Sequence, residues 1–267
     1  MVKQIAERLQ HLREQRPLVH NITNFVVMNN TANALLALGA SPVMVHSPRE
    51  VKEVVAMSNA LLINIGTLSE EWASSMCAAA EYAHRIGRPW ILDPVGAGIS
   101  AFRNEVLQEL LRYRPTVIRG NASEIIALSD FALSGGKGVD STAGSAQASA
   151  SGHQLQKTSG AQVCISGEVD YVIGEQRSVS IHNGSPMMTK VTGLGCTSSA
   201  IIAAFIAQGD DPFLEALAGV SVCSLAGELA ARQSSGPGSL QKNLYDTLYN
   251  LSEVEISTHL NIKEYVH

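Results

Sequence analysis

The chain has 267 residues, of which 45% are hydrophobic, and its 19 basic and 24 acidic side chains give a formal net charge of −5. This composition is typical of a soluble globular protein with one or two domains. The acidic balance and the absence of any block of Lys or Arg exclude proteins that hold nucleic acids or membrane surfaces through a concentrated positive field, so we expect neither partner.

Short β-rich segments alternate with longer segments of helical pattern, which predicts an α/β fold with parallel strands and helical crossovers. The predicted strands cover residues 43–45, 61–65, 90–93, 116–119, 163–166, 171–173 and 179–181. A helix is predicted over residues 69–86, with a cap at Ser69 and a stop at Gly87. A second helix is predicted to begin near Asn121, and a third covers residues 197–208.

The last predicted strands lie closer together than the others. Turn residues at 174–175 and 183–184 predict an antiparallel hairpin at one side of the sheet. The Ser/Gly/Ala-rich stretch 134–152 predicts a surface loop followed by a weak alanine-rich helix, because apolar strands continue on both sides of it. Residues 252–267 fit either a helix or a final edge strand. We therefore expect a single domain over residues 1–267.

Two long stretches, 17–48 and 191–209, contain no Lys, Arg, Asp or Glu. Each holds too many Asn, Thr, Ser and Gly residues for a bilayer core, so we interpret both as buried or ligand-facing segments. Residues 1–16 are rich in charge and lack the apolar core of a signal peptide, and the four cysteines form no CxxC pair. These features predict a cytoplasmic protein with neither a zinc site nor a disulfide framework.

The sharpest local signal is the segment KVTGLGCTSS, which precedes an apolar helix. Its glycines, Gly193 and Gly195, let backbone amides approach a ligand, and the free N–H groups at a helix start suit an anion such as phosphate. Cys196 lies at this helix start. It is either a placed functional group or a small hydrophobic residue that fills a gap.

A second signal is the strand WILD, which ends at Asp93 and runs into the turn PVGAG. Ligands of open α/β sheets bind outside the carboxyl ends of the strands, so Asp93 points toward the expected site. Alternatively, Asp93 opens an Asx-type turn before Pro94. Residues 96–101 also match GxGxxA, but Arg119 and Gly120 stand where a dinucleotide site needs an acid, which weakens an oxidoreductase interpretation.

A third signal, IRGNASE, again joins a strand end to a helix start. Arg119 could hold a phosphate through two hydrogen bonds, and Glu124 could reach a metal ion through water. A capping box would explain Asn121 and Glu124 but not Arg119, whose charge is unfavourable at a helix N-terminus unless an anion is present. No GxxxxGK[ST] motif occurs, because residues 136–137 lack the required neighbours, which excludes a P-loop kinase.

Two further segments end in polar groups. In CISGEVD a strand ends at Ser166, which suits a phosphate contact or a simple hairpin turn. The segments LVHNITN and SPVM place uncharged polar side chains beside Met44. His20 and Met44 taken singly fit core packing, whereas together they would suit a small, neutral, partly aromatic ligand.

Eight motifs follow one another along the chain: LVHNITN, SPVM, LLINIGTL, ILDPVGAG, IRGNASE, SGEVD, TKVTGLGC and GPGS. Their residues and order resemble the hydroxyethylthiazole kinase family of the ribokinase-like superfamily over essentially the whole chain. The resemblance implies a single ribokinase-like domain with a mostly parallel central sheet flanked by helices on both faces. It also implies ATP- and Mg²⁺-dependent phosphorylation of the hydroxyl of 4-methyl-5-(2-hydroxyethyl)thiazole in thiamine salvage, by a homotrimer with active sites at subunit contacts.

The resemblance implies a role for each candidate residue: thiazole binding by Met44, Gly193, Asn21 and Gly66, ATP binding by Arg119, Ser166 and Gly195, magnesium binding by Asp93 and Glu124, and the catalytic position for Cys196. Ser166 replaces the more familiar Thr but keeps the hydroxyl. Other ribokinase-like kinases carry Asp where this chain has Cys196. A thiol with a reference pKa of about 8.5 is a weak proton acceptor at neutral pH, but phosphoryl transfer depends mostly on positioning and charge stabilisation, so a weak base can suffice.

Two other functions stay open at this point. A kinase of the same fold could act on the hydroxymethylpyrimidine or another vitamin alcohol, and a non-catalytic sensor could bind the nucleotide alone. Thermal shifts with each alcohol and with ATP, compared with turnover, distinguish these functions, because a sensor is stabilised by ATP and phosphorylates neither alcohol.

Overall fold

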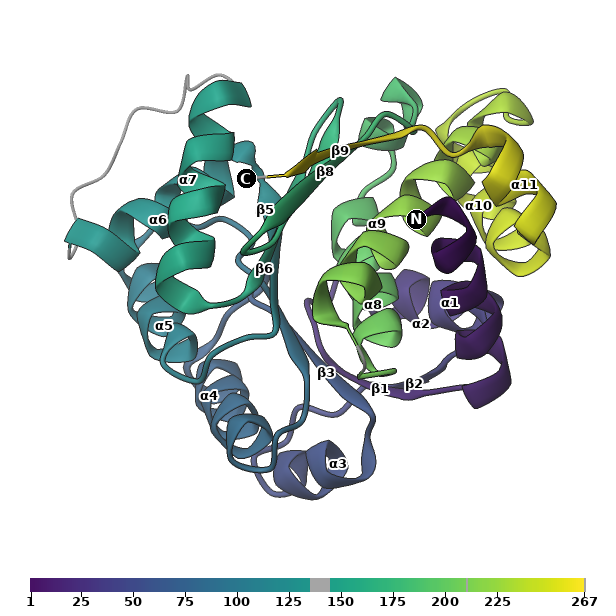
Figure 1. Cartoon of the computed structure of the whole chain (residues 1–267). Helices are drawn as coiled ribbons and strands as arrows, with labels where there is room; N and C mark the ends of the chain where they lie inside the picture. Colours follow the sequence, from purple (N-terminus) through teal and green to yellow (C-terminus); the bar gives the residue numbers. More distant parts are fainter. Residues whose placement is uncertain (135–144, 210, 267) are drawn as a thin grey trace.

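The structure is a computed structural model that describes residues 1–134, 145–209 and 211–266 (Figure 1). The strands are β1 (Leu18–Ile22), β2 (Ser41–Val43), β3 (Ala60–Asn64), β4 (Trp90–Asp93), β5 (Val117–Asn121), β6 (Gln162–Ser166), β7 (Asp170–Ile173), β8 (Arg177–Ile181) and β9 (Ile262–Val266). The helices are α1 (Val2–Gln15), α2 (Met28–Leu38), α3 (Val51–Met57), α4 (Glu70–Arg85), α5 (Ala101–Leu111), α6 (Ala122–Ser134), α7 (Ser145–Ser159), the 3₁₀ helix η1 (Pro186–Lys190), α8 (Leu194–Ile206), α9 (Pro212–Arg232), α10 (Pro237–Asn250) and α11 (Glu253–His259).

The described strands form one sheet in the order β2-β1-β3-β4-β5-β6-β7-β8-β9. Pairing is parallel from β2 to β6 and antiparallel from β6 to β9. This confirms the predicted α/β fold with a mostly parallel sheet, and β7 and β8 form the predicted hairpin, closed by the backbone bond from Gly174 to Arg177. The turn predicted at 183–184 is wrong as a hairpin, because the chain there enters η1.

Other differences from the predicted elements are local. β1 was not among the predicted strands, β2 covers residues 41–43 rather than 43–45, and α8 begins at Leu194 rather than at residue 197. Residues 252–267 contain both alternatives, since α11 is followed by β9. In the stretch 134–152, α7 confirms the predicted helix, whereas the predicted loop, including Gly136 and Lys137, lies outside the described residues.

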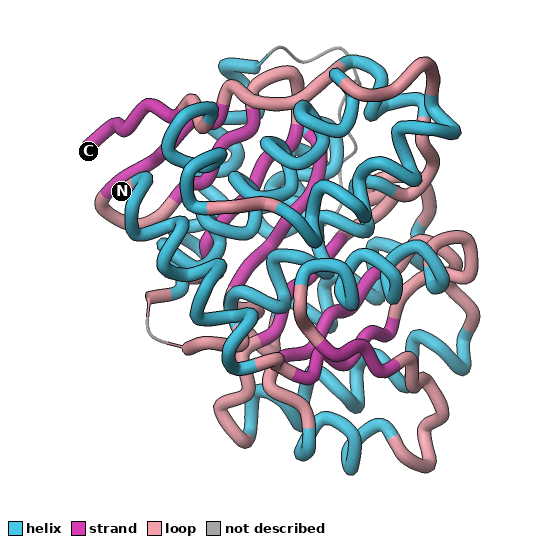
Figure 2. Tube along the Cα trace, turned by 90° about the vertical axis from the view of Figure 1, so that its right-hand side faces the viewer, coloured by secondary structure: helices cyan, strands magenta, loops and turns pink. Residues whose placement is uncertain are grey.

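Helices cover both faces of the sheet, as Figure 1 shows. Alternate residues of the strands point to opposite faces, so Leu62 contributes to one core and Leu61 and Ile63 to the other. The first core lies under α1, α2, α8, α9 and α10, and the second under α3 to α7. In Figure 2 the helices of the first layer lie in front of the strands.

The helix α9 is the one helix in residues 1–134, 145–209 and 211–266 that is long and apolar enough to cross a membrane. However, 94% of its apolar window is buried, and it packs against α1, α8 and α10. Gly219 lets α9 approach α8 closely, because a Cβ atom there would lie 2.7 Å from the Cα atom of Ile202. We therefore describe α9 as a core helix.

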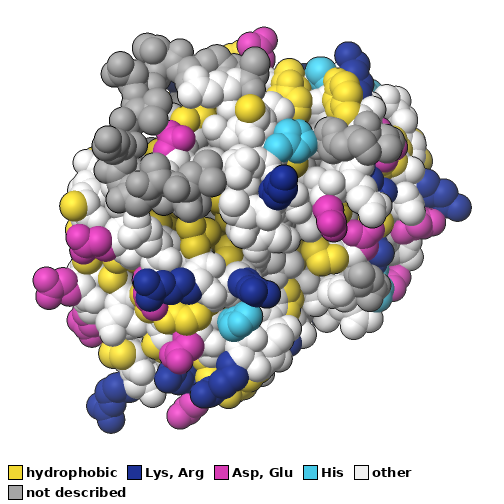
Figure 3. Space-filling model, turned by 60° about the vertical axis from the view of Figure 1, so that its left-hand side comes forward, with side chains coloured by type: hydrophobic (Ala, Val, Ile, Leu, Met, Phe, Trp, Pro, Cys, Tyr) yellow, Lys and Arg dark blue, Asp and Glu magenta, His cyan; other side chains and the backbone are white. Residues whose placement is uncertain are grey.

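The strand order places the expected site. The chain passes from β1 to β2 on one side and, further on, from β3 to β4 on the other, so the connections after β1 and β3 diverge. Ligands of open α/β sheets bind in the crevice at such a switch point, outside the carboxyl ends of the strands. On the face shown in Figure 3, acidic and basic side chains are interspersed and neither sign forms a continuous patch.

Candidate active site

Asp93 lies at the carboxyl end of β4 and is 1% exposed. Its Oδ2 atom accepts hydrogen bonds from Asn64 Nδ2 and from Ser199 Oγ, each 2.7 Å long. Its Oδ1 atom is buried and has no hydrogen-bond partner among the described residues. Burial raises the pKa of Asp93 to about 6, with the nearby charge of Glu124 adding to the shift while Arg119 and the two donors oppose it. The side chain therefore bonds across the sheet, not to an Asx turn.

Cys196 belongs to the same polar group. Asn24 Nδ2 donates both to Asn64 Oδ1 (2.9 Å) and to Cys196 Sγ (3.3 Å), so one amide links the thiol to the partner of Asp93. Cys196 lies in the first turn of α8, and burial, followed by the charge of Asp93, raises the pKa of its thiol to about 11. The thiol is consequently protonated at neutral pH.

The start of α8 depends on two glycines. Gly193 has φ +80°, a conformation that favours glycine, and a Cβ atom there would lie 2.3 Å from Val27 Cγ1. At Gly195 a Cβ atom would lie 2.8 Å from Arg119 Nη1. The absence of a side chain at Gly195 thus lets the guanidinium approach the helix start, where backbone N–H groups favour an anion.

Arg119 lies half-buried on β5. Burial lowers its pKa, but the carboxylates of Asp93 and Asp170 more than offset this, and the resulting pKa is above the ordinary value. The guanidinium is therefore a permanent positive charge, and no hydrogen bond within the described part of the chain occupies it.

A cavity of about 920 Å³ opens beside Arg119, large enough for a nucleotide. Its wall includes Arg119, Ser166, Gly167, Glu168, Val169, Asp170, His182, Asn183, Gly184, Ser185, Pro186, Met188, Thr189, Leu194, Gly195, Ser198, Cys223 and Ser224. The cavity thus brings together the three residues expected to bind ATP. Ser166 also donates to the carbonyl of Gly120 over 3.3 Å, which fixes its hydroxyl at the end of β6.

Glu124 forms the capping box that the sequence offered as an alternative. Asn121 Oδ1 accepts from the N–H of Glu124 (2.9 Å), and Glu124 Oε2 accepts from the N–H of Asn121 (2.8 Å). Its other oxygen accepts from the N–H of Gly96 (3.1 Å), in the loop that follows Asp93. Glu124 therefore caps α6 and also contacts the loop beside Asp93.

The described residues contain no group of three or more His, Cys, Asp or Glu side chains that could enclose a metal ion. Magnesium in kinases is instead held by one or two carboxylates together with substrate phosphates and water. The unpartnered Oδ1 atom of Asp93 suits direct contact with such an ion. Glu124, whose oxygens already accept from backbone N–H groups, suits contact through water. These residues fit magnesium.

The residues expected to bind the acceptor lie in two places. Gly66 lies against Asn24, since a Cβ atom on Gly66 would lie 2.8 Å from Asn24 Nδ2, and Gly193 lies against Val27, three residues further along the chain. Met44, half-buried, follows the edge strand β2, which is three strand spacings, about 14 Å, from β4. Asn21 is buried on β1, where Nδ2 donates to its neighbour Val19 O and Oδ1 has no partner among the described residues.

His20 is a core residue. It is fully buried, its Nε2 atom lies 2.7 Å from Val45 O, and burial lowers its pKa to about 4. Sequence reasoning missed Asn24, Asn64 and Ser199. For Asn64 a signal was available, because an amide directly follows the buried apolar residues of β3. An amide in that position is favoured by contact with a ligand or by a network of hydrogen bonds.

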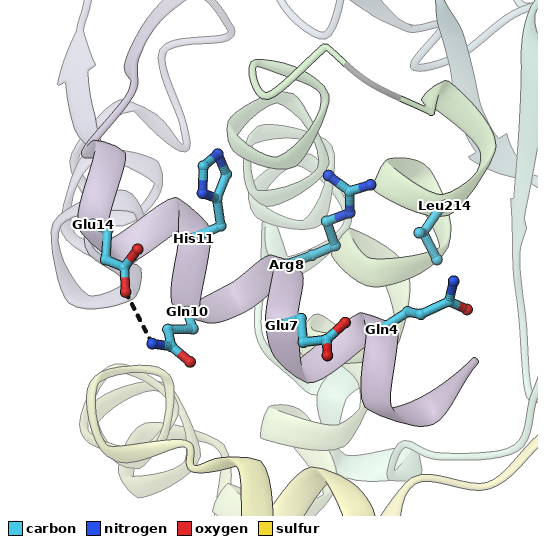
Figure 4. Close-up of a pocket in the computed structure, with 7 residues that line it drawn as sticks. All are labelled: Gln4, Glu7, Arg8, Gln10, His11, Glu14 and Leu214. Carbon is cyan, nitrogen blue, oxygen red and sulfur yellow. Dashed lines mark hydrogen bonds between the residues drawn. The ribbon is translucent and has the colours of Figure 1, made fainter.

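A second cavity, of about 400 Å³, lies along α1 (Figure 4). Gln10 and Glu14 bond to each other there over 2.9 Å, and Arg8 pairs over 3.0 Å with Glu215, which is fully buried. Six of its seven lining residues come from α1, none belongs to the motifs, and we assign the cavity no part in the site.

Comparisons with known proteins agree on one family. The model of the family described as "HK: Hydroxyethylthiazole kinase family" matches residues 9–254. The chain is 51% identical over 252 residues to a hydroxyethylthiazole kinase from Syntrophus aciditrophicus, covering 94% of this chain and 93% of that protein. It is 48% identical to one from Vibrio parahaemolyticus, covering 98% and 99%.

Two solved structures are similar to the chain, one of them at high identity. A hydroxyethylthiazole kinase protein from Pyrococcus horikoshii OT3 superimposes with a TM-score of 0.91 at 40% identity, covering 98% of both chains. The pyridoxal kinase from Staphylococcus aureus in complex with AMP-PCP and pyridoxal superimposes with a TM-score of 0.65 at 14% identity, covering 94% of this chain and 99% of that one. The second likeness is one of fold.

Proposed function

The chain belongs to the hydroxyethylthiazole kinase family, and from this we propose that it transfers the γ-phosphoryl group of ATP to the hydroxyl of 4-methyl-5-(2-hydroxyethyl)thiazole, in thiamine salvage. The observation that carries the proposal is the convergence of three groups at one edge of the sheet: the buried carboxylate of Asp93, the thiol of Cys196 at a helix start, and the guanidinium of Arg119 beside a nucleotide-sized cavity.

The nucleotide occupies the cavity of about 920 Å³ in this proposal. Arg119 and the backbone N–H groups at the start of α8 hold its phosphates, because both present positive charge at the same point. Gly195 permits this arrangement, and the hydroxyl of Ser166 lies on the cavity wall. Phosphoryl transfer demands mainly such positioning and charge stabilisation.

Asp93 and Glu124 would hold Mg²⁺, which when bound neutralises charge that develops on the transferred phosphoryl group. Asp93 offers its unpartnered Oδ1 atom, while Asn64 and Ser199 hold Oδ2 and so fix the direction of the carboxylate. Glu124 acts through water and keeps the loop at Gly96 in place.

Cys196 orients the attacking hydroxyl in this scheme. Because its pKa is about 11, the neutral thiol accepts a hydrogen bond from the alcohol, and the hydroxyl proton passes to an oxygen of the phosphoryl group late in the transfer, as the bond from that group to ADP breaks. Asn24 fixes the sulfur from the other side. The family likeness assigns Met44, Asn21, Gly66 and Gly193 to the acceptor pocket, and of these Gly66 and Gly193 lie beside Asn24 and Val27 in this chain.

We also propose that residues 1–267 act as one cytoplasmic kinase domain that assembles as a homotrimer, with active sites at subunit contacts. Two observations support this. Phe25 and Val26, which directly follow Asn24, are 65% and 61% exposed, so apolar side chains lie open beside the site. All four cysteines carry free thiols. Light scattering coupled to size exclusion should give three times the chain mass of 28.4 kDa.

The test of function is an ADP-release assay over a panel of alcohols, namely the thiazole alcohol, hydroxymethylpyrimidine and pyridoxal, with ATP alone as the blank. We expect the thiazole alcohol to give the highest kcat/KM. Faster turnover of another alcohol would assign a different substrate, and stabilisation by ATP without turnover of any alcohol would make the chain a nucleotide sensor.

A further inference from the structure

Arg103, in the first turn of α5, turns its side chain back toward the sheet. Its Nη1 atom donates to the backbone carbonyls of Ile65 and Val95, the latter over 2.9 Å, and its Nη2 atom donates to the carbonyl of Gly66 over 2.8 Å. One guanidinium therefore joins the loop that follows β3 to the loop that follows β4. Arg103 lies outside the eight motifs of the sequence.

These carbonyls need a donor because the two strands separate at this point. β3 and β4 are paired up to Asn64 and Asp93, and the last ladder bond runs from the N–H of Ile65 to the carbonyl of Asp93 over 3.3 Å. Beyond it the backbone carbonyls no longer face a neighbouring strand. A planar guanidinium can donate to several acceptors in fixed directions, which a lysine ammonium on its flexible chain does not reproduce.

Both loops lead to residues of the site. In the loop after β3, the N–H of Gly66 donates to Asn64 Oδ1 over 3.0 Å, and Asn64 in turn holds Asp93. In the loop after β4, the N–H of Gly96 donates to Glu124 Oε1 over 3.1 Å. The guanidinium thus connects two loops. One of them contacts Asn64, which bonds to Asn24 and through it reaches Cys196, and the other contacts Glu124.

The start of α5 is itself fixed to the second loop. Ser100 Oγ accepts from the N–H of Arg103 over 3.3 Å, and Asn104 Oδ1 accepts from the N–H of Gly98 over 3.1 Å. Because the helix is tied to the loop by these caps, the Arg103 side chain has a firm base from which to hold the neighbouring loop.

We propose that Arg103 is a positioning residue of the phosphoryl transfer. It sets the distance between the loops after β3 and β4, and so the distance between the acceptor hydroxyl and the carboxylates of Asp93 and Glu124. It acts through the backbone of Gly66 and Gly96. The expected kinetic effect rests on the proposed kinase function, whereas the effect on the loop geometry does not.

The kinetic test compares Arg103→Ala and Arg103→Lys with Arg112→Ala. Arg112 follows the same helix, but its side chain is 74% exposed and pairs with Glu109, so it is a matched control. We expect kcat/KM for the thiazole alcohol to fall about tenfold to a hundredfold in both Arg103 variants, because small displacements at a reacting centre cost this much. The KM for ATP should stay within about twofold, since Arg119 remains in place.

Chemical rescue separates local positioning from a general loss of structure. Methylguanidinium, added at concentrations far below those that unfold proteins, should restore part of the alcohol kcat/KM in Arg103→Ala but not in Arg103→Lys, where the side chain still fills the space. Absence of rescue together with a lowered Tm in Arg103→Ala would overturn the proposal in favour of a merely structural role.

Hydrogen exchange tests the loop geometry without any substrate. In Arg103→Ala, amides in residues 65–68 and 95–99 should exchange faster than in the wild type, while Arg112→Ala should show wild-type exchange in both loops. Unchanged exchange in both loops, or faster exchange with wild-type kinetics, would overturn the proposal. A wild-type enzyme that phosphorylates no alcohol would instead contradict the proposed function, and the exchange comparison would still decide whether Arg103 holds the two loops.

Discussion

Cys196 differs from the other cysteines in its neighbours. The amide of Asn24 donates to its sulfur, and the carboxylate of Asp93 lies close enough to disfavour a second negative charge. Because the pKa is about 11, fewer than about one Cys196 thiol in a thousand is ionised at pH 7.5. The chemistry at this position is therefore that of a neutral thiol, which orients the alcohol more than it removes the proton.

Replacing Cys196 by Ala should lower kcat by less than about a hundredfold and leave both KM values nearly unchanged, because the neutral thiol orients the alcohol and full general-base assistance is not at stake. Cys196→Asp should retain activity, since a carboxylate also accepts a hydrogen bond from the alcohol and can in addition accept its proton. Steady-state kinetics check both, with Cys77→Ala on α4 as the control. Wild-type kcat in Cys196→Ala would assign the thiol to packing.

Arg119→Ala should raise the KM for ATP about tenfold or more and affect the KM for the thiazole alcohol far less. The reason is that a charge-assisted hydrogen bond to phosphate contributes roughly 1.5 to 3 kcal/mol. Kinetics at saturating alcohol measure the effect. If the ATP dependence of the variant equals that of the wild type, the guanidinium has a structural role.

Asp93→Asn and Glu124→Gln should each shift activity to higher magnesium concentrations, since each removes a negative charge beside the ion. Magnesium titrations of activity provide the measurement. Glu124→Gln also weakens the cap of α6, so its Tm is measured alongside, whereas Asn at position 93 keeps the shape of the side chain. Titrations that coincide with the wild type for both variants would place the metal elsewhere.

At the scale of elements, local signals predicted some boundaries well. Ser69 caps α4 by accepting from the N–H of Trp72, and Gly87, with φ +67°, follows its end. β1 was missed because His20 and Asn21 are unusual in a strand, and only burial on both faces selects that conformation there. Propensity cannot anticipate such tertiary packing.

Some residues of the site were likewise predicted from the sequence and others were missed. Asp93, Arg119, Ser166 and Gly195 were found because each lies near the end of a strand or the start of a helix within a motif, and the structure brings the last three to one cavity. Asn24 and Ser199 were not found. Their hydrogen bonds join residues 40 and 106 positions apart in the chain, and no local pattern encodes such a pairing.

Buried His20 on β1 makes stability depend on pH. Its pKa is about 4 in the folded chain and 6.5 when unfolded, so the unfolded chain binds the extra proton between these values. Its contribution is therefore present above pH 6.5 and is lost as the pH falls toward 4, by about 2 kcal/mol at pH 5. Urea unfolding at pH 7.5 and pH 5 should show a smaller pH dependence for His20→Gln. An equal dependence in both proteins would assign the loss to other groups.

At the scale of the whole molecule, one sheet carries two layers of helices, and the site lies where residues from both layers meet the carboxyl ends of the strands. Glu124 comes from α6 in one layer, and Cys196 and Ser199 come from α8 in the other. A ligand that contacts both layers therefore lowers the free energy of the folded state as a whole.

We therefore expect ATP with magnesium to stabilise the entire protein. At a ligand concentration about 100 times Kd the gain is about 2.7 kcal/mol, which corresponds to a Tm increase of roughly 5–10 °C for a chain of this size. Differential scanning calorimetry measures the shift. Arg119→Ala should show a smaller one at equal ATP, and an identical shift would place the nucleotide away from Arg119.

The order of the strands also bears on how the protein is made. From β3 to β9 the spatial order of the strands equals their order in the chain, so each new strand leaving the ribosome can join an edge that already exists. The layer of α3 to α7 is complete once α7 has emerged, but α8, α9 and α10 are synthesised later. Until they arrive, a nascent chain exposes much of one apolar face of its sheet and lacks Cys196 and Ser199. Burial of that face and assembly of the phosphate-binding helix start thus coincide, late in synthesis, and an unfinished chain cannot be an active one.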